Sequence, residues 1–116
     1  MEMVLPALSG VHLINLVGQT TVNELVEVVR RAQLFIGADS ATFHVAAALR
    51  KPAICLAGGG HWGRFVPWGM TERTKVLTHK LDCFGCNWAC GRATVDCIAG
   101  IETDDVIRHA RELLVL

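Results

Sequence analysis

The sequence has no excess of charge of either sign and no long apolar run. Eleven lysines and arginines balance eleven aspartates and glutamates, so charge gives no support for binding to nucleic acid or to an acidic membrane surface. No apolar run approaches the roughly 20 residues that a membrane-spanning helix needs. We also find no internal repeat, low-complexity segment or linker.

The sequence is rich in hydrophobic residues instead. They make up 52% of the 116 residues, which argues against disorder and suits one small domain with a modest core. Residues 1–4 lack the basic region of a signal peptide, so we expect a cytoplasmic protein.

The most informative stretch is residues 37–48. An apolar run, residues 34–36, ends at Gly37, and an alanine-rich helix follows Asp39 and Ser40. The first N–H groups of a helix lack intrahelical partners, and the helix dipole favours an anion there. His44 lies one turn in on the face of Ser40 and can add a donor. The stretch therefore predicts an anion site, with an ordinary helix capped by Asp39 or Ser40 as the alternative.

The remaining pattern alternates strands with helices. Short apolar runs predict strands at residues 11–17, 34–36, 53–56 and 75–78. Thr21 and Glu24 form a capping box, and the helix that it opens carries an apolar stripe of Val22, Leu25, Val26 and Val29. Further helices are predicted at residues 42–49, ended by Pro52, and after a capping Thr103. Such alternation predicts an α/β fold with a parallel sheet, flanking helices and right-handed crossovers.

A glycine-rich loop at residues 58–69 is the second candidate site. Glycines allow a ligand or a mobile loop, which makes Gly59 a candidate binding residue. Arg64 can bind a phosphate with two hydrogen bonds, and Trp62 can stack on a base or sugar. The alternative is a flexible connection whose aromatic residues cover the edge of the core: Trp62, Phe65 and Trp68.

Four cysteines gather in an otherwise irregular segment, residues 81–100. Their spacing is Cys83-x2-Cys86-x3-Cys90-x6-Cys97, and four thiols can hold a structural zinc ion. Zinc sites usually have two well-separated cysteine pairs, so we favour reduced cysteines that pack with Phe84 and Trp88. Disulfides are not expected in a cytosolic protein. Cys55, in an apolar strand, is expected in the core.

Residues 37–48 resemble the signature of glycosyltransferase family 9, the ADP-heptose:lipopolysaccharide heptosyltransferases. The family motif is Asp-Ser/Thr-Gly, two residues, His, one residue, Ala, one residue, Ala. The matching residues are Asp39, Ser40, His44, Ala46 and Ala48. Ala41 stands where the family usually has glycine, and its methyl group crowds a phosphate that approaches the backbone. Residues 16–25, 51–58 and 58–69 also resemble family segments, in the same order.

The resemblance implies a fold and a role. Family members have two Rossmann-like domains in the GT-B arrangement, and residues 1–116 resemble the later part of the second, nucleotide-sugar-binding domain, here a single truncated domain. The donor diphosphate would face the N–H groups of Ser40, Ala41 and Thr42, assisted by the Ser40 hydroxyl and His44. Asp39 would serve the turn and a sugar or ribose hydroxyl. No metal is needed if these groups stabilise the leaving diphosphate.

The resemblance also implies what this chain lacks. The general base of these inverting enzymes lies in the first, acceptor-binding domain, so no catalytic residue is assigned here. We expect a nucleotide-sugar-binding part of an enzyme of lipopolysaccharide core biosynthesis, cytoplasmic or peripheral at the inner face of the membrane, and inactive alone. Loss of preceding strands would expose an apolar sheet edge. The alternatives are an orphan half-domain that binds nucleotide or self-associates, and a small metal-stabilised domain.

Overall fold

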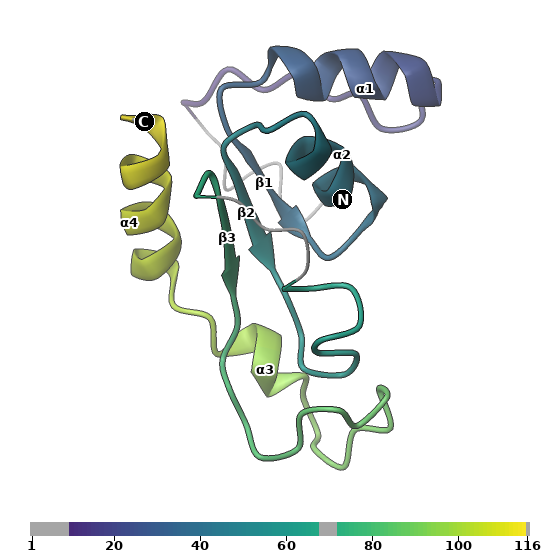
Figure 1. Ribbon diagram of the computed structural model, residues 1–116, viewed down its shortest axis with the longest axis vertical. Helices are drawn as coiled ribbons and strands as arrows, with labels where there is room; N and C mark the ends of the chain where they lie inside the picture. Colours follow the sequence, from purple (N-terminus) through teal and green to yellow (C-terminus); the bar gives the residue numbers. More distant parts are fainter. Residues whose placement is uncertain (1–9, 68–71, 116) are drawn as a thin grey trace.

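The computed structural model describes residues 10–67 and 72–115. Its elements follow the order α1 (Val22–Arg31), β1 (Phe35–Ala38), α2 (Ala41–Ala48), β2 (Ala53–Leu56), β3 (Thr74–Leu77), α3 (Asp96–Ala99) and α4 (Thr103–Leu114). The three strands are parallel and pair in the order β1-β2-β3 (Figure 1). The predicted α/β class, with a parallel sheet flanked by helices, is confirmed as a partial Rossmann-like fold.

The central strand β2 is covered on both faces. Successive side chains of a strand point to opposite faces. Ala53 and Cys55 belong to the main core cluster with Phe43 and Ala46 of α2. Ile54, also fully buried, points to the other face, and α4 packs against β2. In Figure 1 the two helices accordingly lie on either side of the strands.

The first helix begins at the predicted capping box. The Glu24 N–H donates to the Thr21 hydroxyl at 3.3 Å, and the Thr21 N–H donates to the Glu24 carboxylate at 2.7 Å. The Thr21 hydroxyl also donates to that carboxylate, at 2.8 Å. The bond from the Thr21 N–H, and to a smaller extent the bond from its hydroxyl, lower the pKa of the Glu24 carboxyl. Val29 is buried and Leu25 and Val26 are half-buried, but Val22 is 76% exposed, so the predicted stripe begins one turn later.

Residues 11–17 do not form the predicted strand. Local bonds replace a ladder: the Asn15 side chain accepts from the Val17 N–H at 3.1 Å, and the Gln19 N–H donates to the Leu16 carbonyl at 3.0 Å. Gly18 has a φ of 71° and turns the chain. Asparagine side chains offer the backbone such alternatives to sheet pairing, and here the local turn wins. The strand β1 is therefore an edge strand, and its Ile36 is 47% exposed.

The later boundaries differ from the sequence prediction in small ways. The strand β3 begins one residue before the predicted one. The last helix has Glu102 as its N-cap, with no side-chain capping bond, so Thr103 is its first residue rather than its cap. The cysteine segment contains the single-turn helix α3. Trp68, predicted to cover the core edge, lies outside the described residues.

Candidate functional site

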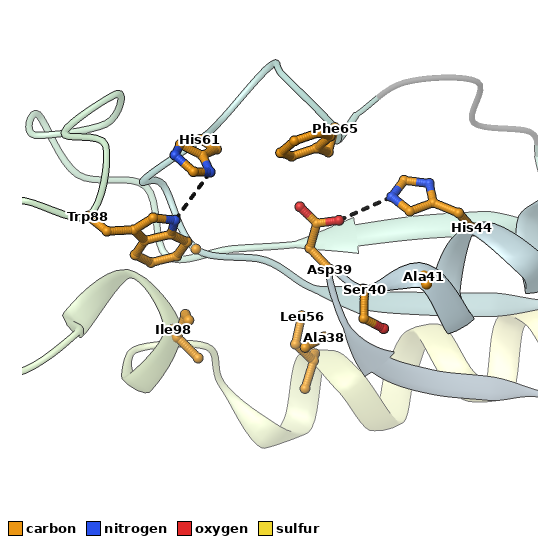
Figure 2. Close-up of a pocket in the computed structure, with 11 residues that line it drawn as sticks. Ala38, Asp39, Ser40, Ala41, His44, Leu56, His61, Phe65, Trp88 and Ile98 are labelled. Atoms are coloured by element: carbon orange, nitrogen blue, oxygen red, sulfur yellow. Dashed lines mark hydrogen bonds and ion pairs between the residues drawn. The ribbon is translucent and has the colours of Figure 1, made fainter.

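A pocket of about 420 Å³ opens where the carboxyl ends of β1 and β2 meet the start of α2. Ala38 ends β1, Leu56 ends β2, and both line it. Ligands of open parallel sheets bind beyond the carboxyl ends of the strands, so this is the expected place for a site. Gly58 also lines the pocket. Figure 2 labels the other lining residues: Asp39, Ser40, Ala41, His44, His61, Phe65, Trp88 and Ile98.

One end of the pocket, which we call the helix end, consists of residues 38–44. The first bond of α2 runs from the His44 N–H to the Ser40 carbonyl at 3.3 Å. The N–H groups of Ala41, Thr42 and Phe43 precede that bond and have no carbonyl in the preceding turn to pair with. Ser40 is the N-cap residue, but its hydroxyl makes no capping bond. The helix end therefore presents backbone donors and a hydroxyl, as an anion requires.

Asp39 and His44 face each other across this end. His44 Nε2 lies 3.2 Å from Asp39 Oδ1, and both side chains are partly exposed (Figure 2). With a proton on Nε2, the imidazole donates to the carboxylate and is held over the first turn of α2. The pair places an imidazole and a carboxylate beside the backbone N–H groups of α2. A phosphate can therefore bind to the N–H groups and the imidazole, and a hydroxyl group can donate to the carboxylate.

The other end, the loop end, consists of His61, Phe65, Trp88 and Ile98. His61 stands in edge contact with both neighbouring rings, at 6.0 Å between centroids in each case. The Trp88 indole N–H donates to His61 Nδ1 at 3.3 Å, and His61 Nε2 lies 2.6 Å from Asn87 Oδ1. Since an indole N–H can only donate, Nδ1 accepts and Nε2–H donates to Asn87. This chain of bonds uses both nitrogens of a neutral imidazole.

The glycines at residues 58–60 allow aromatic side chains to pack directly against the backbone of the loop. A Cβ on Gly58 would lie 2.4 Å from Trp88, and one on Gly60 also 2.4 Å from Trp88. Of the described glycines in this loop, only Gly63 has a positive φ, 84°. The Asn87 N–H donates to the Gly60 carbonyl at 2.9 Å, and the Gly85 N–H donates to the Gly59 carbonyl at 2.8 Å. The glycines therefore let the cysteine segment lie directly on the loop.

The sequence-predicted site residues separate into two groups. Asp39, Ser40, Ala41 and His44 line the pocket together, and Thr42 follows in the first turn of α2. Gly59 lies outside that lining: it is buried under Phe84, and its N–H donates to Cys97 Sγ at 3.3 Å. Arg64 is also outside the lining, with its guanidinium 5.2 Å from the Phe65 ring centre.

Sequence reasoning missed His61 and Trp88 as pocket residues. It named Trp62 as able to stack on a base or sugar, with covering of the core edge as the alternative, and Trp62 packs against the main core cluster and against Phe84. The one sequence signal for Trp88 was indirect. Three consecutive glycines indicate that something approaches the backbone closely, and here the approaching group is the indole.

The cysteine segment surrounds a separate, small cavity of about 10 Å³. Its lining includes all four cysteines of the segment. Cys97 is buried, and a hydrogen bond to Cys83 raises the pKa of the Arg92 guanidinium. Within residues 10–67 and 72–115, no three histidine, cysteine or acidic side chains are arranged to hold a metal ion. The packed-thiol prediction stays a prediction.

Cys55 is a core residue, as predicted. It is fully buried in β2. Burial, with a smaller contribution from the Asp39 charge, raises the pKa of the Cys55 thiol to about 12. Cys55, which precedes the pocket residue Leu56 in β2, is therefore a neutral thiol at physiological pH and not a nucleophile.

A parallel sheet flanked by helices, with α2 starting at the carboxyl ends of the strands, defines a partial Rossmann-like architecture. Comparison with known families is more specific. The sequence pattern of glycosyltransferase family 9 (heptosyltransferase) matches residues 2–87, more than half of the chain. The chain belongs to this family, which confirms the resemblance.

One curated relative, lipopolysaccharide heptosyltransferase 3 of Escherichia coli, is 45% identical to this chain over 53 residues. The match covers 46% of this chain and 16% of that protein. The chain thus corresponds to a small part of its relative. No solved structure matches the chain. None of the described helices is both long enough and apolar enough to cross a membrane.

Proposed function

We propose that this chain binds the diphosphate of an ADP-heptose-like nucleotide-sugar at the helix end of the pocket, as part of an inverting glycosyltransferase of lipopolysaccharide core biosynthesis. The observation that carries the proposal is the coincidence of the family motif with the pocket: Asp39, Ser40 and His44 all line it at the start of α2. The proposal includes a GT-B arrangement, in which residues 1–116 are the later part of the second domain, and a cytoplasmic location.

The chemistry follows from the charge that develops on the leaving group. During glycosyl transfer the bond between the sugar and the diphosphate breaks, and the diphosphate gains negative charge. Backbone N–H groups of Ala41 and Thr42 and the positive end of α2 stabilise that charge, with the Ser40 hydroxyl and His44 adding hydrogen bonds. Asp39, an anion itself, serves a hydroxyl of the sugar or ribose and orients His44.

The test is a titration with ADP followed by backbone amide shifts. We expect the largest shifts at residues 39–44, because those N–H groups meet the phosphates. Inorganic pyrophosphate is the second probe and should shift the same amides. Shifts confined to residues 81–100, or none at all, would refute the proposal.

The chain alone should not transfer sugar. Transfer requires the acceptor and a general base held in register with the donor, and we place both in a partner domain. Donor-dependent transfer to a lipopolysaccharide-core acceptor by the purified chain would contradict this part of the proposal.

A second candidate function, self-association, has one supporting observation. Large apolar residues are exposed along the segment before α1, at the start of that helix and on the edge strand: Val11, Leu13, Ile14, Leu16, Val17, Val22 and Ile36. Exposed apolar side chains in these segments fit an interface with a second copy or with another domain. Sedimentation equilibrium of the chain and of an Ile14→Lys variant tests it. If the wild-type chain remains monomeric at high concentration, self-association is excluded.

A further inference from the structure

We propose that the indole of Trp88 is the platform against which the nucleobase of the donor stacks; this inference rests on the proposed function. The loop end of the pocket is built around this side chain. Trp88 packs on the backbone of Gly58 and Gly60, and the residue remains 48% exposed at the pocket.

The position of Trp88 is fixed by several contacts. Its N–H is bound to His61, and His61 is bound to Asn87. The Asn87 N–H is bound in turn to the Gly60 carbonyl. Asn87 and Trp88 have positive φ values of 52° and 64°, which cost energy in residues with a side chain and persist only where the surroundings hold them. The ring is therefore held in place before any ligand arrives, and His61 is its positioning residue.

The chemistry of the loop end selects a base over a sugar. Of the polar side chains in the pocket lining, Asp39, Ser40 and His44 belong to the helix end, and His61 belongs to the loop end. At the loop end both nitrogens of His61 are already bonded, and the other lining side chains are apolar or aromatic: Phe65, Trp88 and Ile98. A sugar ring buried there would leave hydroxyl groups without partners, which is costly. A nucleobase presents an apolar face to the indole and keeps its polar edge toward solvent.

The arrangement of the two ends fits a nucleoside diphosphate. Figure 2 shows His44 and Asp39 on one side of the pocket and His61 and Trp88 on the other. With the diphosphate on the α2 N-terminus, a base linked to it through ribose extends away from the helix. The aromatic side chains of the loop end lie in that direction, and their surface is complementary to the face of a base.

The experiment compares three probes on the wild-type chain and on Trp88→Ala: ADP, inorganic pyrophosphate and ADP-ribose. We expect Trp88→Ala to weaken ADP and ADP-ribose equally, by roughly tenfold or more, as for loss of one base–aromatic stack. Pyrophosphate affinity should not change. Trp88→Phe, which keeps a ring, should restore most of the ADP affinity. Phe84→Ala is the matched control: it removes a ring from the same segment outside the pocket lining.

The outcomes separate this inference from the proposed function. Three results for Trp88→Ala would overturn the role of Trp88 and leave the helix-end site standing. They are an equal loss of affinity for ADP and pyrophosphate, an unchanged affinity for ADP, and a loss of affinity for ADP-ribose alone. No binding of any probe to the wild-type chain would overturn both. If Trp88→Ala does not fold, nuclear Overhauser contacts between adenine protons and the Trp88 indole in the wild-type complex decide. Their absence in a saturated complex refutes stacking.

His61 has a separate test. His61→Leu removes the acceptor of the Trp88 N–H and frees the indole to move. We expect ADP affinity to fall while pyrophosphate affinity is kept, and the Trp88 indole N–H resonance to lose its protection from solvent exchange. A loss of both ligands together would assign His61 a purely structural role.

Discussion

The two ends of the pocket are built in different ways. The helix end comes from one contiguous stretch, residues 38–44, and rests on Phe43, which is fully buried. The loop end brings together residues from the glycine loop, the cysteine segment and α3, and its aromatic residues Phe65 and Trp88 are about half exposed. The helix end is thus held by the main core, whereas the loop end is held by rings lying on glycines and by a chain of hydrogen bonds.

We expect the largest difference between the two ends when a phenylalanine of each is replaced by alanine and the free energy of unfolding is measured. Phe43→Ala removes a fully buried ring beneath the helix end and should reduce the free energy of unfolding by about 3–5 kcal/mol. Phe65→Ala removes a ring that is 45% exposed and should cost much less. Urea unfolding of both variants measures the difference. Equal losses would mean that the loop end is as much a part of the core as α2.

A substitution at Gly60 tests how the loop end is held. In Gly60→Ala the new Cβ would lie 2.4 Å from the indole of Trp88, so the ring must move. We expect a loss of about 1–3 kcal/mol in stability, as for other overpacked sites. The resonances of Trp88 and His61 should shift while those of residues 41–48 stay.

Gly91→Ala is the matched control for that substitution. Gly91 lies in the same cysteine segment as Trp88 and has no positive φ, and a Cβ added to it would meet no atom within 4 Å. Its substitution should leave stability and spectra unchanged. If Gly60→Ala is equally silent, the close packing of Trp88 on the loop is wrong.

This contrast also explains how far the sequence could predict the molecule. The helix end could be predicted because its signals, the apolar run, Gly37 and the alanine-rich helix, are adjacent in sequence. The capping box at Thr21 and the strand at residues 53–56 were predictable for the same reason. Each depends on hydrogen bonds or side-chain alternation within a few residues.

The loop end could not be predicted in that way. The role of Trp88 depends on contact with Gly58 and Gly60, which lie in another segment of the chain. The prediction of a strand at residues 11–17 was wrong for a different reason. Their composition favours a strand, but a strand needs a partner strand to pair with. The Asn15 side chain offers local hydrogen bonds to the backbone instead. Composition describes what a segment prefers, and only the fold determines which neighbours it has.

A smaller effect is expected at the helix end itself. His44→Ala should weaken ADP binding by about 1–2 kcal/mol, as for loss of one hydrogen bond to a charged group. The affinity for pyrophosphate should fall as much as the affinity for ADP, because His44 donates to the phosphates. This pattern is the reverse of that expected for Trp88→Ala. A loss that spares pyrophosphate would place His44 on the nucleoside rather than on the phosphates.

The smallest effect is expected from a metal chelator, and it bears on the loop end alone. If zinc bound the four cysteines, its binding energy would be part of the folding energy of residues 81–100, and a chelator would release that segment. Trp88 would then leave Gly58 and Gly60, while α2 would stay on its core. We expect no change, because packed thiols need no metal and the described cysteines do not converge on one. The measurement is elemental analysis of protein purified without added metal, followed by melting with and without chelator while the Trp88 and Phe43 resonances are monitored. About one equivalent of zinc per chain, with loss of the Trp88 signal and retention of Phe43, would show that the loop end depends on a metal and the helix end does not.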